Sequence, residues 1–177
     1  MIRTRSATLA LALLTTLAAS AQPAQPTLAS VLDAQLTGIE KQFVSAADAM
    51  PEDQYSFAPH TGDFAGVRTF ALEITPGVTV AGAANGPDTL RTKAQILACL
   101  KASFALDHKA LASLTAENAL TPLPNSPVPS MNTRLALATF GLEHARDHYG
   151  QMVEYLRQNG IVPPASQGQP PANPPHK

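Results

Sequence analysis

Apolar residues recur along most of the chain at steps of three and four, the spacing of one face of an α-helix. Four segments have this spacing, at about 27–49, 63–84, 92–114 and 132–159, with prolines and glycines between them. No stretch alternates with the period of two that is typical of a half-buried strand. The pattern therefore predicts an all-α fold, and four amphipathic helices of this length favour an antiparallel four-helix bundle.

Residues suited to start or stop a helix lie at the ends of these segments. Thr27 is a suitable N-cap for the first helix, and Pro51 follows its end. In the second segment Pro76 removes a backbone donor, so we expect this helix to be kinked or broken near Ile74. Gly160 is the expected C-cap residue of the last helix.

The last segment separates its charged and apolar positions most clearly. Plotted at about 100° per residue, one side carries Leu137, Gly141, Ala145, Met152 and Tyr155, and the other carries Glu143, Arg146, Asp147, Glu154 and Arg157. His144 and His148 fall in the apolar sector. Residues four apart share a helix face, so we expect both imidazoles to point into the bundle interior.

The composition fits one domain with a mainly aliphatic core and argues against nucleic acid as a partner. Hydrophobic residues make up 45% of the chain but only 5% are aromatic, so the core must be mainly aliphatic. A net charge of -1 provides no broad cationic surface for a phosphate backbone, which argues against nucleic-acid binding. Cys99, as the one cysteine, cannot form an intramolecular disulfide, and its place in an apolar pattern predicts a packing role.

The first 21 residues have the pattern of a Sec-type secretory signal. Two arginines precede an apolar run at 7–17, and the small residues at 19–21 form a cleavage site after Ala21. The apolar run is about half of the roughly 20 residues needed to cross a bilayer, which argues against a stable membrane anchor. We therefore expect a secreted or periplasmic protein.

The predicted organisation follows from this signal and from the two chain ends. Residues 1–21 are the signal peptide, 22–26 a short linker and 27–166 the helical bundle. Residues 167–177 are rich in proline and poor in apolar groups, which predicts a disordered tail.

The pair of His144 and His148 is the clearest candidate for chemistry. Imidazole is the commonest protein ligand for zinc and nickel, and two on one helix face are half of such a site. A site of this kind normally needs a third protein ligand and leaves a position for water or substrate. On the residues alone, the alternative is a pair of histidines that form hydrogen bonds in or beside the core.

The same region resembles the C-terminal signature of DinB-like, YfiT-type proteins. The string HARDHYGQ at 144–151 is followed by YLR at 155–157 and by GIVPPAS at 160–166. Further matches are AMPE at 49–52, YSF at 55–57, VRTF at 67–70 and the stretch 93–104. The resemblance covers the chain from about Leu28 to Ser166.

This resemblance implies a four-helix bundle, often dimeric, with a divalent metal held by three histidines. One comes from the second helix and two from the fourth, and His144 and His148 match the fourth-helix pair. Counting from 67–70, the second-helix histidine is replaced by Pro76. Because proline cannot ligate a metal, the resemblance implies an incomplete family site.

Two other side chains are candidates to approach the pair. Glu73 lies one turn before Pro76, and at a kink its carboxylate can complete a site of two histidines and one carboxylate. His108, beside Asp107 on the third helix, either reaches the same interior or covers the edge of the core as a partly exposed residue.

Two functions therefore stay open. The first is an enzyme that depends on a divalent metal such as Zn or Ni and is similar to the family's thiol transferases and hydrolases, in which the ion polarises a substrate or activates a thiol or water. The second is a non-catalytic bundle that binds a small molecule or a partner protein in the same groove. The sequence leaves the oligomeric state open, and a homodimer is one option, because pairing would bury exposed leucine faces.

Overall fold

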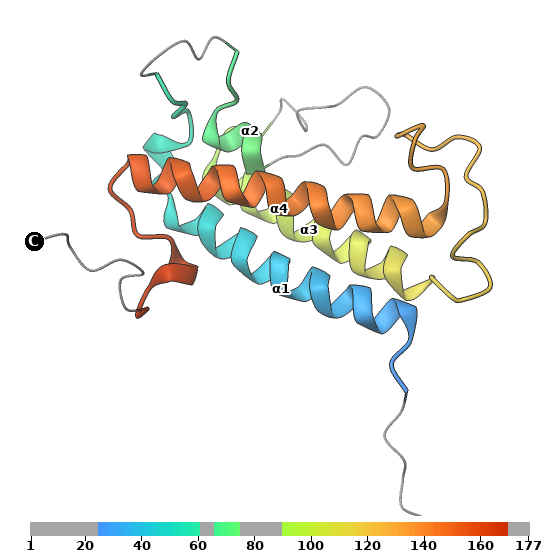
Figure 1. Cartoon of the computed structure of the whole chain (residues 1–177). Coiled ribbons are helices and arrows are strands. Elements are labelled where there is room, and N and C mark those ends of the chain that lie inside the picture. Colours follow the sequence, from blue (N-terminus) through green and yellow to red (C-terminus); the bar gives the residue numbers. More distant parts are fainter. Residues whose placement is uncertain (1–24, 61–65, 75–89, 170–177) are drawn as a thin grey trace, which may run out of the picture.

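Three long helices lie side by side, and a short fourth helix packs near one end of them (Figure 1). The computed structural model describes residues 25–60, 66–74 and 90–169. The helices are α1 (Leu28–Ala49), α2 (Phe70–Ile74), α3 (Lys93–Ala112) and α4 (Arg134–Gln158). Two short 3-10 turns, Glu52–Gln54 and Pro164–Ser166, follow α1 and α4. No strand occurs in the described ranges, and the predicted all-α fold of four packed helices is confirmed.

α1 begins and ends where its sequence predicts. The hydroxyl of Thr27 accepts a hydrogen bond from the backbone N–H of Ser30, and the Ser30 hydroxyl accepts one from the backbone of Thr27. This reciprocal capping box satisfies two donors that a helix start leaves free. Pro51 follows the end of the helix, and one face is buried from Leu32 to Ala47.

α4 also agrees closely with its predicted bounds, and Gly160 ends it. The Gly160 N–H donates to the Arg157 carbonyl and the Ile161 N–H to the Leu156 carbonyl, both at 2.9 Å. These two bonds form a Schellman motif, which needs a left-handed residue after the C-cap. Gly160 supplies it with a φ of 72°.

The expected start of the second helix was wrong. Residues 66–69 are not helical, and Gly66 has a φ of 84°, which a right-handed helix excludes. The N–H groups of Phe70 and Ala71 donate to the carbonyls of Phe57 and Tyr55, at 2.7 and 2.9 Å. Residues 55–57 therefore take the place of a preceding helical turn. The rest of the predicted helix, with Pro76 and its kink, lies outside the described residues.

The long helices share a mainly aliphatic core. α3 runs opposite to α1, since Lys93 at its start bonds the carbonyl of Met50 and His108 near its end contacts Asp33. Phe43 of α1 meets Phe104 of α3 edge to face, with ring centroids 5.9 Å apart. In the described part of the chain, the largest side chains that are almost completely buried are Ile39, Phe43, Met50, Phe70, Glu73, Ile74, Met152 and Leu156. Glu73 is the charged residue among these eight, and it contacts His148 of the candidate site.

No helix in the described part of the chain is both long enough and apolar enough to span a membrane. The predicted signal peptide at 1–21 lies outside the described residues, as do most of the linker and residues 170–177 of the tail.

Replacing Gly160 with alanine should lower the free energy of unfolding by about 1–2 kcal/mol, because an L-residue is strained in the left-handed region. No atom would crowd the added Cβ, so the cost comes from the backbone. Gly141, inside α4, is the matched control: its Cβ also meets nothing. Gly141→Ala should stabilise by about 0.5–1 kcal/mol. Urea unfolding measures both changes in stability. If both variants changed the stability equally and in the same direction, the left-handed role of Gly160 would be wrong.

Candidate functional site

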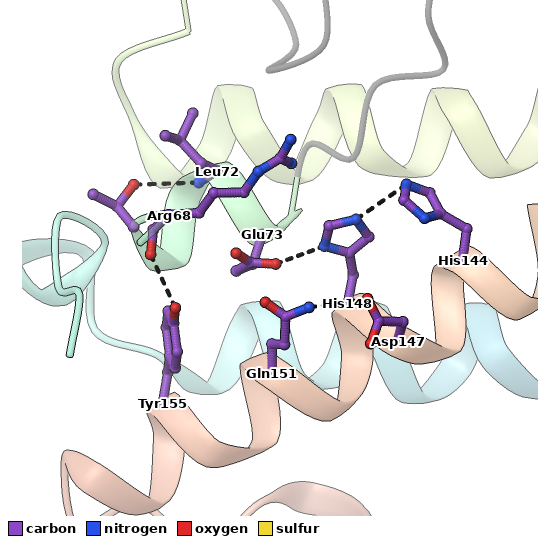
Figure 2. A network of polar contacts seen from close by, with 9 residues as sticks. Arg68, Leu72, Glu73, His144, Asp147, His148, Gln151 and Tyr155 are labelled. Carbon is purple, nitrogen blue, oxygen red and sulfur yellow. Dashed lines mark hydrogen bonds and ion pairs between the residues drawn. The ribbon is translucent and has the colours of Figure 1, made fainter. Parts of the chain in front are cut away.

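His144 and His148 lie one turn apart on α4 and face each other beside α2 (Figure 2). Their Nε2 atoms are 3.1 Å apart, and the two rings meet nearly at right angles with centroids 4.4 Å apart. At this distance the nitrogens share one proton, which one ring donates and the other accepts. The two nitrogen atoms therefore converge on one small volume.

A buried carboxylate fixes the orientation of His148. Glu73 of α2 is 1% exposed and His148 is 5% exposed. The Oε2 atom of Glu73 lies 2.6 Å from Nδ1 of His148, so the ring donates its Nδ1–H to the carboxylate. A carboxylate removed from water needs such a partner. Because Nδ1 is engaged by Glu73, the Nε2 atom is the one that faces His144 (Figure 2).

The ring of His144 is held by neighbours on its own helix. Phe140, one turn earlier, stacks on it with ring planes 14° apart and centroids 5.4 Å apart. Desolvation of the ring, and next the charge of His148, lower the pKa of His144 below its ordinary value. His144 is therefore neutral at neutral pH, the form in which imidazole binds metals.

The expectation that both histidines point into the core was half right. His148 is buried, but His144 is exposed. Four residues advance a helix by about 400°, so His144 lies about 40° further round α4 than His148. Tyr155, which is buried, lies within this same offset, so the cover supplied by neighbouring elements, and not the angle on α4 alone, leaves His144 exposed. The pair thus joins the core to the surface.

Comparison with known proteins identifies the family. The model of the family described as DinB superfamily matches residues 60–152, just over half of the chain. The chain belongs to the DinB superfamily. The match covers α2, α3 and most of α4, and it includes Glu73, His144 and His148. No curated protein matches the chain.

The two imidazoles of this DinB-superfamily protein fit two positions of a metal site. A tetrahedral zinc ion with Zn–N bonds of about 2.0–2.1 Å holds two nitrogen ligands about 3.3–3.4 Å apart. The observed separation of 3.1 Å is close to this value. A divalent ion would take the place of the proton that the two Nε2 atoms share.

Glu73 reaches the pair, but on the far side of the His148 ring. Its carboxylate contacts Nδ1, whereas an ion shared with His144 would lie at Nε2. In this arrangement Glu73 is a hydrogen-bond partner of a ligand and not a third ligand itself. Among residues 25–60, 66–74 and 90–169, no group of three or more His, Cys, Asp or Glu side chains is placed to hold a metal ion. Pro76, at the expected position of the family histidine, falls outside those ranges.

The other sequence candidates lie elsewhere. His108 contacts Asp33 and Glu40 of α1 and does not join the pair. Tyr155 donates its hydroxyl proton to the carbonyl of Arg68 at 3.0 Å, which ties the residues just before α2 to α4 (Figure 2). Burial raises the pKa of the Tyr155 hydroxyl, so it stays protonated and can donate.

Sequence reasoning missed Phe140 and the partner of Tyr155. Phe140 lies four residues before His144, so the i, i+4 rule could have predicted the stacking. The contact of Tyr155 with Arg68 joins residues 87 apart in the sequence, and no local pattern encodes it.

Replacing Glu73 with leucine should lower the free energy of unfolding by about 1–3 kcal/mol, because the buried Nδ1–H of His148 loses its acceptor. Glu73→Gln is the matched control: its amide oxygen can still accept this bond, and the loss should be smaller. Urea unfolding at pH 7 checks both. A leucine variant as stable as the parent would show that the buried pair does not hold α2 on α4.

Proposed function

We propose that this DinB-superfamily protein binds a divalent transition-metal ion such as Zn or Ni through the Nε2 atoms of His144 and His148. The observation that carries the proposal is the convergence of these two atoms at 3.1 Å on one face of α4. Helix spacing alone brings two histidines onto one face, but it does not make their ring nitrogens meet.

The contact of Glu73 with His148 supports this function. Metal-binding histidines commonly donate their second ring N–H to a carboxylate, which fixes the ring and raises the basicity of the ligating nitrogen. Glu73 and His148 have this geometry, with 2.6 Å between Oε2 and Nδ1. We therefore assign Glu73 as the residue that orients His148.

The exposure of His144 supports access from solvent. An ion at the pair would have a buried ligand on one side and a surface ligand on the other. Two protein ligands leave further coordination positions for water or a small-molecule ligand. A bound ion is a Lewis acid that would polarise a substrate placed there, which suits thiol transfer or hydrolysis.

A second candidate is a non-catalytic bundle that binds a small molecule or partner protein. A specific observation favours it: hydrogen bonds join Glu73 to His148 and His148 to His144. In the described part of the molecule, no buried side-chain nitrogen or oxygen lacks a partner. The three side chains would then be a structural network between α2 and α4.

Under either candidate we propose that the protein is exported. This rests on the signal-peptide pattern of residues 1–21 and places the helical bundle in the periplasm or outside the cell.

Metal content after purification without an affinity tag distinguishes the two candidates. We expect a stoichiometric amount of Zn or Ni by elemental mass spectrometry, and its loss in the double variant His144→Ala, His148→Ala. The matched control is His60→Ala, because the His60 ring lies against Phe57 and not at the pair. If the folded parent protein binds no Zn or Ni even from excess, the metal function is wrong and the non-catalytic bundle is favoured.

Glu73→Gln should weaken metal affinity by about 10–100-fold, the usual effect of removing a carboxylate behind a metal-binding histidine. The residual affinity reflects the two imidazoles, which the variant keeps. Competition with a chromophoric chelator measures it, and circular dichroism confirms that the variant is folded. Because the glutamine oxygen can still accept the bond from His148, unchanged affinity would rule out that the charge of Glu73 strengthens the ligand, whereas the metal function itself would stand.

A further inference from the structure

A second histidine lies between two carboxylates at the contact of α1 with α3. Nδ1 of His108 is 2.6 Å from Oδ1 of Asp33, and its Nε2 is 3.1 Å from Oε2 of Glu40. His108 belongs to α3, whereas Asp33 and Glu40 lie two turns apart on α1. The side chain of His108 is 28% exposed, so these contacts are partly shielded from water.

The geometry determines the charge of this ring. An ionised carboxylate accepts hydrogen bonds and donates none, so both ring nitrogens must be donors to satisfy both contacts. An imidazole carries two N–H groups only when it is protonated. In the neutral ring, one nitrogen lone pair would face a carboxylate oxygen at close range, and that contact would become repulsive.

The three side chains connect parts of the chain that are far apart in sequence. His108 is 75 residues from Asp33 and 68 from Glu40. Through them, the second half of α3 is attached to residues 33–40 of α1, whereas the histidine pair lies at the contact of α2 with α4. The cluster is thus independent of the proposed metal function.

We propose that His108 is a proton-dependent clamp between α1 and α3, which adds to the stability of their contact when its ring is protonated and loses this contribution when the proton leaves. Protonation of this one ring would make the stability of the bundle depend on pH.

The electrostatics of the cluster agree with this proposal. The hydrogen bond to Asp33 raises the pKa of His108 most, desolvation opposes it, and Glu40 raises it further. Asp33 and Glu40 are the charged groups of other described elements that act on the ring. On its own helix, Asp107 lies next to it, and burial raises the pKa of the Asp107 carboxyl.

The sign of the effect follows by linkage. Folding raises the pKa of His108 above the value of about 6.5 for an unfolded histidine. The clamp therefore contributes its full stability below about pH 6.5 and loses it as the pH rises through the higher pKa of the folded state.

Unfolding in urea between pH 6 and pH 9 tests the clamp, with His108→Gln compared with the parent protein. The parent should be more stable at pH 6, and the difference should shrink as the pH rises. The ratio of the two folding constants should fall by about tenfold for each unit by which folding raises the pKa. The other histidines titrate in both proteins, so their effect cancels when the free energy of unfolding of the variant is subtracted from that of the parent. A difference that does not change with pH overturns the proposal.

A direct titration of the His108 ring by NMR separates a clamp from a merely structural contact. The midpoint in the folded protein should lie above 6.5. Asp33→Asn should lower it more than Glu40→Gln, because the bond to Asp33 has the larger effect. Glu143→Gln, which removes an exposed carboxylate from α4, is the matched control and should leave it unchanged. A midpoint at or below 6.5 in the parent protein overturns the proposal even if every variant folds.

Discussion

The buried contact between Glu73 and His148 is the constraint on which the candidate site depends. A carboxylate that is 1% exposed must be paired, and His148 pairs it at 2.6 Å. The described part of α2 is five residues long, and five residues are too few to be stable as an isolated helix. It is held by the burial of Phe70 and Ile74, by the backbone of residues 55–57 and by this contact. The same contact turns Nε2 of His148 toward His144.

The protein contains two histidine clusters that differ in what faces the ring nitrogens. At His148 one nitrogen faces a carboxylate and the other faces His144, which leaves two nitrogen atoms close enough to share a cation. At His108 both nitrogens face carboxylates, so the protonated ring is itself the cation. The same side chain thus supports opposite roles, and its neighbours from other helices decide between them.

Membership of the DinB superfamily accounts for the helical fold around the site but does not establish the chemistry of the site. The family match spans α2 to most of α4, and the helices keep the family's all-α architecture. A fold can keep its shape while its functional side chains change. Here the fourth-helix pair is present, and Glu73 contributes a carboxylate behind one of its rings. The proposed function therefore rests on this local geometry and not on the family name.

The sequence by itself determined three long helices, the caps at Thr27 and Gly160 and the placement of two histidines on one helix face. These features depend on residues within a turn or two of one another, which a linear pattern contains. It also marked Glu73 as a candidate partner of the pair. It did not determine that His144 would be exposed, because the exposure of a side chain depends on which neighbouring elements cover it.

The tertiary structure alone decided where α2 begins and which ring nitrogen each carboxylate contacts. α2 begins at Phe70 because the carbonyls of Tyr55 and Phe57 accept its first N–H groups. Glu73 meets His148 across 75 residues of sequence, and Asp33 meets His108 across the same number. Contacts over such separations form when packed helices bring the side chains together, and no local spacing in the chain specifies them.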